Sequence, residues 1–146
     1  MIIRKENVMF NEANVYLKNK KDTYAVNVWV NKGGEHRPRL KVSIGSKFNN
    51  GNNVSVGFEP TTNQILKIED SHFHGSNSEK SKCIDIATAF IVFAADTLKD
   101  GYESPIGLDQ KAIDNCEKRF NKISNKEFNI LVEEGKKNAK KGVKFE

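Results

Sequence analysis

The sequence predicts an α+β protein, with an N-terminal antiparallel β-meander of about five strands packed against C-terminal helices. Three observations predict this fold. Apolar and polar residues alternate up to residue 70, the connections between these runs are short and contain Gly, Asn or Pro, and the apolar period becomes helical after residue 76. Short connections favour antiparallel neighbours. We expect a single domain over residues 1–146, β-rich over 1–70 and helical over 76–141.

The expected strands share an alternation of apolar and other residues between turn residues. They are Val15–Leu17, Tyr24–Val30, Leu40–Ile44, Val54–Phe58 and Ile65–Ile68. Because successive side chains of a strand point to opposite faces, one face of this sheet enters the core and the other is free to carry polar residues.

Three helices are expected after the strands. Two serines have a glutamate three residues later, which is the spacing of a capping box: Ser76 with Glu79, and Ser124 with Glu127. The first box begins an apolar helix that continues to Leu98, and the second begins the last helix. Between them, residues 112–120 repeat apolar side chains at helical spacing. We expect the tail, residues 136–144, to be solvated or frayed.

Composition narrows the class of protein. The chain carries a net charge of +5, which favours an anionic partner through long-range attraction. Cys83 and Cys116 fall in helix-like apolar patterns, so we expect buried thiols in a reducing cytoplasm rather than a disulfide framework. The longest apolar stretch, residues 83–98, is interrupted by two aspartates and is too short to span a bilayer, so no membrane partner is expected.

A row of cations is the most informative local pattern. Arg37, Arg39 and Lys41 occupy every second position of residues 36–44, a segment that leads into and includes the expected strand Leu40–Ile44, and the chain contains only four arginines in total. Arginine grips phosphate and carboxylate with a planar fork. We therefore expect this strand to bind an anionic group, assisted by Lys32 and His36 from the preceding loop. Replacing Arg37 and Arg39 together by alanine should abolish ligand binding and leave the fold intact.

A second interpretation treats the same row as a solvated edge strand. Pro38 favours this interpretation, because proline cannot donate to a strand ladder and is typical of strand starts and edges. Lysine and arginine on an edge also discourage pairing with another chain.

Trp29 adds an aromatic ring to the pattern. It alternates with valines on either side, so it belongs to the wetter face of its strand, and that strand should neighbour the one of Arg37 and Arg39 in a hairpin. A ring beside cations can hold a base and its phosphate. Alternatively, Trp29 packs under the C-terminal helices or in a dimer contact.

Catalytic and metal-binding patterns are weak. His72 and His74 flank a phenylalanine beside Asp70, and His36 could join them at a divalent metal, but this short spacing is more typical of a plain loop. Asp85 and Asp96 lie about three turns apart on one expected helix and could approach one cleft. We expect no catalytic residue, no metal and no cofactor.

Together these patterns predict a non-catalytic protein that uses a basic sheet face to bind an anionic ligand, with single-stranded nucleic acid or a nucleotide favoured. One alternative is a phage or mobile-element accessory or inhibitor protein that binds an acidic surface of a host protein. A second is a small metal-dependent enzyme that uses His72 and His74. An open strand edge would further allow a homodimer.

Overall fold

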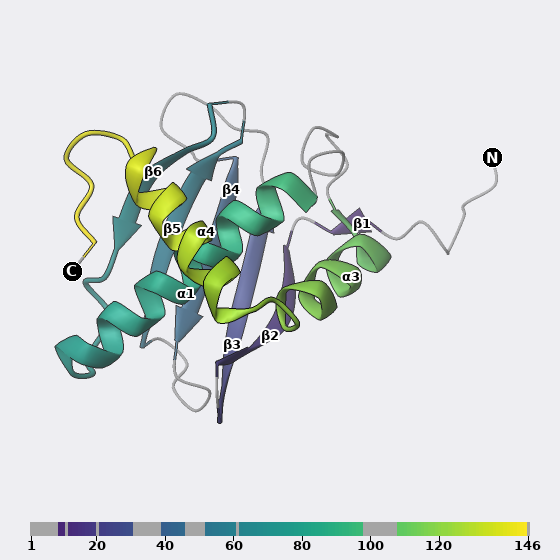
Figure 1. Ribbon diagram of the computed structural model, residues 1–146, viewed down its shortest axis with the longest axis horizontal. Coiled ribbons are helices and arrows are strands. Elements are labelled where there is room, and N and C mark those ends of the chain that lie inside the picture. Colours follow the sequence, from purple (N-terminus) through teal and green to yellow (C-terminus); the bar gives the residue numbers. More distant parts are fainter. Residues whose placement is uncertain are drawn as a thin grey trace.

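The computed structural model describes residues 9–10, 12–19, 21–30, 39–45, 52–60, 62–97 and 108–145. Its main sheet has five antiparallel strands in the order β2-β3-β4-β5-β6, and the helices lie together on one face of it (Figure 1). The strands are β2 (Glu12–Asn19), β3 (Asp22–Val30), β4 (Leu40–Gly45), β5 (Asn53–Glu59) and β6 (Gln64–Glu69). The α+β fold, with a meander first and helices after it, is confirmed.

Each strand of the meander pairs with the next one along the chain, as the short connections predict. The register places Val28 opposite Val42 and Val42 opposite Val56, so apolar residues of successive strands form rows on one face. Only the pairing of β5 with β6 is irregular, with a register shift between Gly57 and Phe58. These rows are fully buried and form the sheet's half of the core.

The helix α1 (Asn77–Thr97) supplies the other half of the core and lies across β4 and β5 (Figure 1). Its first turn is capped as expected, because the Oγ of Ser76 accepts a hydrogen bond from the N–H of Glu79 at 3.1 Å. The expected end of this helix at Leu98 lies outside the described residues. No helix in the described ranges is long and apolar enough to cross a membrane.

Two further helices complete the layer. In α3 (Gln110–Phe120), the ring of Phe120 meets Phe90 of α1 edge to face with 5.1 Å between centroids. The last helix, α4 (Asn125–Lys137), packs along α1, and its N-cap Ser124 accepts from the N–H of Glu127. Both helices confirm the spacing of apolar residues in the sequence.

The C-terminal tail differs from its prediction. After α4 the chain turns back along β6, where the N–H of Lys140 donates to the carbonyl of Ile65 at 2.8 Å. Val143 and Phe145 are half-buried against the core. Most side chains of this tail are solvated as expected, but the tail is not frayed, because β6 offers an unused acceptor on its outer edge and the core offers apolar contact. A short pairing of β1 (Met9–Phe10) with β7 (Leu108–Asp109) was also not expected.

Two side chains cover part of the outer edge of β2: Glu117 of α3 and Asn121, the residue that follows this helix. The N–H of Tyr16 donates to Oε2 of Glu117 at 2.6 Å, and the N–H of Lys18 donates to Oδ1 of Asn121 at 2.9 Å. The amide of Asn121 also donates to the carbonyl of Tyr16 at 2.9 Å. These side chains thus bond the edge groups of Tyr16 and Lys18 that a further strand would otherwise pair with.

Candidate anion-binding sheet face

The sheet face opposite α1 carries the predicted site, and we call it the open face. On β3, Val28 and Val30 are buried toward the helices, whereas Trp29 between them is 42% exposed. On β4, Lys41 lies between buried Leu40 and Val42 in the same way. Successive side chains of a strand point to opposite faces of the sheet, so Trp29 and Lys41 both lie on the open face. The interpretation in which Trp29 packs under the C-terminal helices is therefore wrong.

Trp29 and Lys41 are direct cross-strand partners. The Nζ of Lys41 lies 5.4 Å from the centroid of the Trp29 ring, within the range of a cation–π interaction. Within the part of the chain that the structure describes, no carboxylate oxygen lies within 4.0 Å of this ammonium. The pair therefore presents an aromatic ring and a cation side by side.

Arg39 has a different environment. Its Nε lies 3.4 Å from Oε2 of Glu59 on the neighbouring strand, close enough for an ion pair, although the geometry does not make it a hydrogen bond. Both side chains are partly buried. An external phosphate at Arg39 must compete with this carboxylate, so Lys41 is the better placed of these two cations. The other predicted ligand residues, Lys32, His36 and Arg37, lie outside the described residues.

The strand that carries the cations is the central strand of the sheet. β4 pairs with β3 on one side and with β5 on the other over its whole length. The interpretation of this segment as a protected edge strand is therefore wrong, because both of its ladders are already occupied. Pro38 itself lies outside the described residues.

A second ion pair lies across the open face on β6. Nζ of Lys67 lies 2.9 Å from Oε1 of Glu69. The hydrogen bond from Lys67 lowers the pKa of the Glu69 carboxyl, and the charge of Lys41 lowers it further despite some burial. The carboxylates of Glu59 and Glu69 on this face thus each have a cation beside them.

A row of neutral polar side chains crosses the open face next to the ring and the cation. In register from β2 to β5 its members are Asn14, Asn27, Ser43 and Ser55. The amide of Asn27 donates to Oδ1 of Asn14 at 3.3 Å, and the hydroxyls of Ser43 and Ser55 lie 2.9 Å apart. These groups can donate to and accept from a polar ligand edge.

Tyr16 is an exposed aromatic residue of the open face that was not among the residues predicted from the sequence. It lies between buried Val15 and Leu17 on β2 and is 58% exposed. The signal was present in the sequence, because Asn14, Tyr16 and Lys18 alternate with apolar residues. It was missed because Tyr16 stands within an apolar run, where a tyrosine is as typical of the core as of the surface.

The histidines are not brought together into a metal site. His72 and His74 are both exposed in the connection between β6 and α1, and the carboxylate of Asp70 lies 3.2 Å from Nζ of Lys80. In the described ranges, no group of three His, Cys, Asp or Glu side chains could hold a metal ion. His36 lies outside those ranges.

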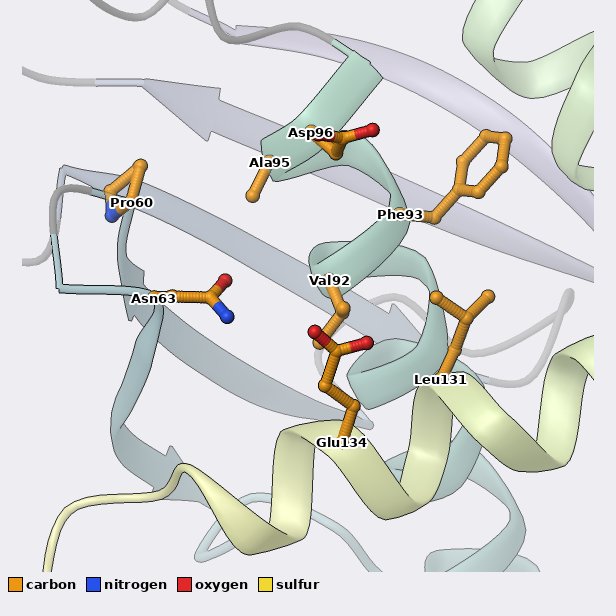
Figure 2. Close-up of a pocket in the computed structure, with 8 residues that line it drawn as sticks. All are labelled: Pro60, Asn63, Val92, Phe93, Ala95, Asp96, Leu131 and Glu134. Atoms are coloured by element: carbon orange, nitrogen blue, oxygen red, sulfur yellow. The ribbon is translucent and has the colours of Figure 1, made fainter.

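Asp85 and Asp96 belong to different surfaces. Oδ1 of Asp85 lies 3.8 Å from Nζ of Lys136, and burial raises the pKa of this carboxyl. Asp96 instead lines a cavity of about 530 Å³ between the end of α1, α4 and the turn that joins β5 to β6 (Figure 2). The two carboxylates therefore do not share a cleft.

The cavity at the end of α1 is not suited to the predicted anionic ligand. Figure 2 shows the carboxylate of Glu134 and the amide of Asn63 turned toward the same space, with Val92 and Leu131 forming apolar wall. Its two charged lining residues, Asp96 and Glu134, are both acidic. Negative charge at this cavity repels phosphate, so this cavity does not suit the predicted ligand.

Comparison of the chain with protein-family models, with curated proteins and with solved structures finds no match. The functional argument therefore comes from the arrangement of the side chains on the open face.

Proposed function

We propose that this chain is a non-catalytic binding protein whose open face binds an anionic ligand with an aromatic base, namely single-stranded nucleic acid or a nucleotide. The observation that carries the proposal is the cation–π pair of Trp29 and Lys41. A ring with an exposed face can stack on a base of any sequence, and an ammonium beside it can meet the phosphate of the same nucleotide.

The position of the pair supports binding. β3 and β4 are inner strands with complete ladders, so the backbone under Trp29 and Lys41 is rigid. Binding to a preorganised surface costs less free energy, because fewer protein groups must be ordered when the ligand binds. The net charge of +5 attracts polyanions to the molecule over distances of about 10 Å at moderate salt.

Fluorescence offers a direct test because Trp29 is the only tryptophan of the chain. The probes are a single-stranded oligothymidylate and a thymidine mononucleotide, added to the full chain at several salt concentrations. We expect quenching of Trp29 emission on binding and a dissociation constant that rises with salt, because phosphate contacts release counterions. Removing the ring with Trp29→Ala should raise the dissociation constant of a labelled oligonucleotide about five- to a hundredfold.

A matched pair of lysine variants separates a defined site from general attraction. Lys41→Ala and Lys126→Ala remove the same charge, but Lys126 is exposed on α4, which packs on the other side of the molecule. We expect weaker binding for Lys41→Ala and nearly unchanged binding for Lys126→Ala. Equal losses in both variants, or a chain that binds neither probe, would rule the proposal out.

If the chain binds neither probe, the hypothesis of an accessory protein that binds an acidic host protein would be favoured instead. Native mass spectrometry of the chain with a host lysate would then be the next measurement, and a mass shift caused by an acidic protein would support that hypothesis. For the compartment we propose the cytoplasm, since the two cysteines of the chain, Cys83 and Cys116, are unpaired thiols.

A further inference from the structure

A second exposed ring lies on the open face with Trp29. Tyr16 on β2 and Trp29 on β3 are both exposed large hydrophobic residues on the same side of the sheet. Within the described ranges the third such residue is Ile130 on α4, which is not part of the sheet. The large apolar groups exposed on the sheet are therefore two aromatic rings on adjacent strands.

The backbone positions of Tyr16 and Trp29 are far apart compared with the spacing of stacked bases. Tyr16 pairs with Ala25, and Trp29 lies four residues further along β3. At about 3.4 Å per residue and one strand spacing apart, the two Cα atoms are separated by roughly 14 Å. Stacked nucleotides rise by about 3.4 Å each, so this span covers about four stacked steps, or fewer in an extended strand.

Neutral hydrogen-bonding groups occupy the space between the rings. Asn14 and Asn27 form the row midway between the row of Tyr16 and the row of Trp29. Asn27 donates to Oδ1 of Asn14 and, at 3.4 Å, to Oε2 of Glu12. These two bonds use the N–H groups of Asn27 and the oxygen of Asn14, so Oδ1 of Asn27 and the N–H groups of Asn14 can face the edge of an unpaired base.

Both rings have a lysine beside them. Lys41 lies over Trp29, and Lys18 follows Tyr16 by two positions on the same side of β2. The phosphates of an oligonucleotide that contacts both rings would therefore have a lysine near each ring. The acidic neighbour Glu12 lies opposite Trp29, and its carboxylate is engaged by Asn27.

The backbone beneath Tyr16 is held in place by α3. Its N–H is hydrogen-bonded to the side chain of Glu117 in α3, and its carbonyl to the side chain of Asn121, the residue that follows this helix. The N–H of Lys18 is bonded to Asn121 as well. These bonds restrain the backbone that carries the Tyr16 ring, although β2 is an edge strand.

From this arrangement we propose that the open face is a two-ring site for single-stranded nucleic acid, in which Trp29 and Tyr16 stack on two bases that are not adjacent and Asn14 and Asn27 contact a base between them. This inference rests on the proposed function and narrows its ligand from nucleotides in general to an oligonucleotide. The bound nucleic-acid chain would run parallel to β2 and β3 and not across the sheet.

The test is the dependence of affinity on oligonucleotide length. Oligothymidylates from a mononucleotide up to about eight nucleotides cover the lower part of known single-strand site sizes. They are titrated against wild type, Tyr16→Thr and Tyr16→Phe, with Trp29 fluorescence as the readout. Threonine keeps the strand propensity and removes the ring, whereas phenylalanine keeps the ring. Ile130→Ala removes an exposed apolar side chain elsewhere and is the control.

We expect Tyr16→Thr to leave the mononucleotide affinity unchanged and to weaken the longer oligonucleotides about five- to a hundredfold, since one stacking contact is lost. Tyr16→Phe and Ile130→Ala should bind like wild type. If Tyr16→Thr binds every length normally while Trp29→Ala does not, the site has one ring, and this inference fails while the proposed function stands. If wild type binds no probe, both fail together.

Discussion

The carboxylate of Glu117 on α3 accepts a hydrogen bond from the main-chain N–H of Tyr16 on β2, with 2.6 Å between the nitrogen and Oε2. Asn121, one helical turn later, accepts from the N–H of Lys18 and donates to the carbonyl of Tyr16. An exposed strand edge is a template for another chain, and here these two side chains occupy part of it.

The first prediction concerns this covered edge. Asn121→Ala removes two hydrogen bonds to β2 and should lower the free energy of unfolding by about 1–3 kcal/mol. It should also speed hydrogen exchange at the Lys18 amide. Asn115→Ala, at an exposed position of α3, is the control. Urea unfolding and exchange measured by NMR would check both effects, and equal stability of the two variants would contradict the role of Asn121.

The homodimer stays a prediction that light scattering can test. The edge groups of Tyr16, Lys18 and Ile65 are already bonded within the chain, so strand pairing between two copies would have to use other positions. We expect Asn121→Ala to self-associate more than wild type, because it frees part of the edge of β2. Identical masses for the two proteins would show that this edge is not used.

A second prediction concerns the contact between α4 and α1. A Cβ added at Gly135 would collide with Cγ2 of Thr88 and crowd Ile65 and Val92. In an exposed helix the change from Gly to Ala stabilises by about 0.5–1 kcal/mol, but here we expect Gly135→Ala to destabilise by about 1–3 kcal/mol.

Thr88→Ser removes the colliding methyl group and completes a double-mutant cycle with Gly135→Ala. The cost of Gly135→Ala should be smaller in the Thr88→Ser background, with the difference read from urea unfolding. Additive effects would mean that the backbone of α4 shifts instead, and that Thr88 does not set the distance between the helices.

A third prediction concerns alkaline pH. Burial raises the pKa of the Cys83 thiol to about 11 and that of Cys116 to about 12, from an ordinary value of 9.0. The unfolded chain therefore loses these protons at lower pH than the folded chain. Their contribution to stability is complete below pH 9, falls by about 1.4 kcal/mol per pH unit for each thiol above it, and is lost as pH passes the folded values.

This loss is measured as the free energy of urea unfolding at neutral pH and near pH 10. Lysines and tyrosines also titrate there, so the informative quantity is the difference from Cys116→Ala. That variant should be less stable at neutral pH because of its cavity, and its stability should fall less steeply with rising pH. Parallel pH profiles would contradict a pKa raised by burial.

A fourth prediction separates Lys41 of β4 from Arg39, the residue just before this strand. Because Arg39 is paired with Glu59 and Lys41 has no carboxylate within 4.0 Å in the described ranges, Lys41 should make the phosphate contact. Lys41→Ala should reduce the slope of log Kd against log salt by about 1, whereas Arg39→Ala should leave the slope nearly unchanged. A larger change for Arg39→Ala would reverse this assignment.

Local chemistry in the sequence determined much of the fold. Alternation of apolar residues defined the five strands, and the serine–glutamate pairs at Ser76 and Ser124 marked two helix starts that the structure reproduces. The same alternation assigned Trp29 and Lys41 to the face away from the core. These features depend on residues close together in the chain, so they can be recognised without a structure.

Tertiary structure alone decided which carboxylate neutralises which cation and where the second ring stands. Arg39 meets Glu59, Tyr16 shares a face with Trp29, and Lys140 pairs with Ile65 only after strands and helices have taken their places. Such contacts join residues far apart in the chain, and their free energies depend on register and packing that a periodic pattern does not encode.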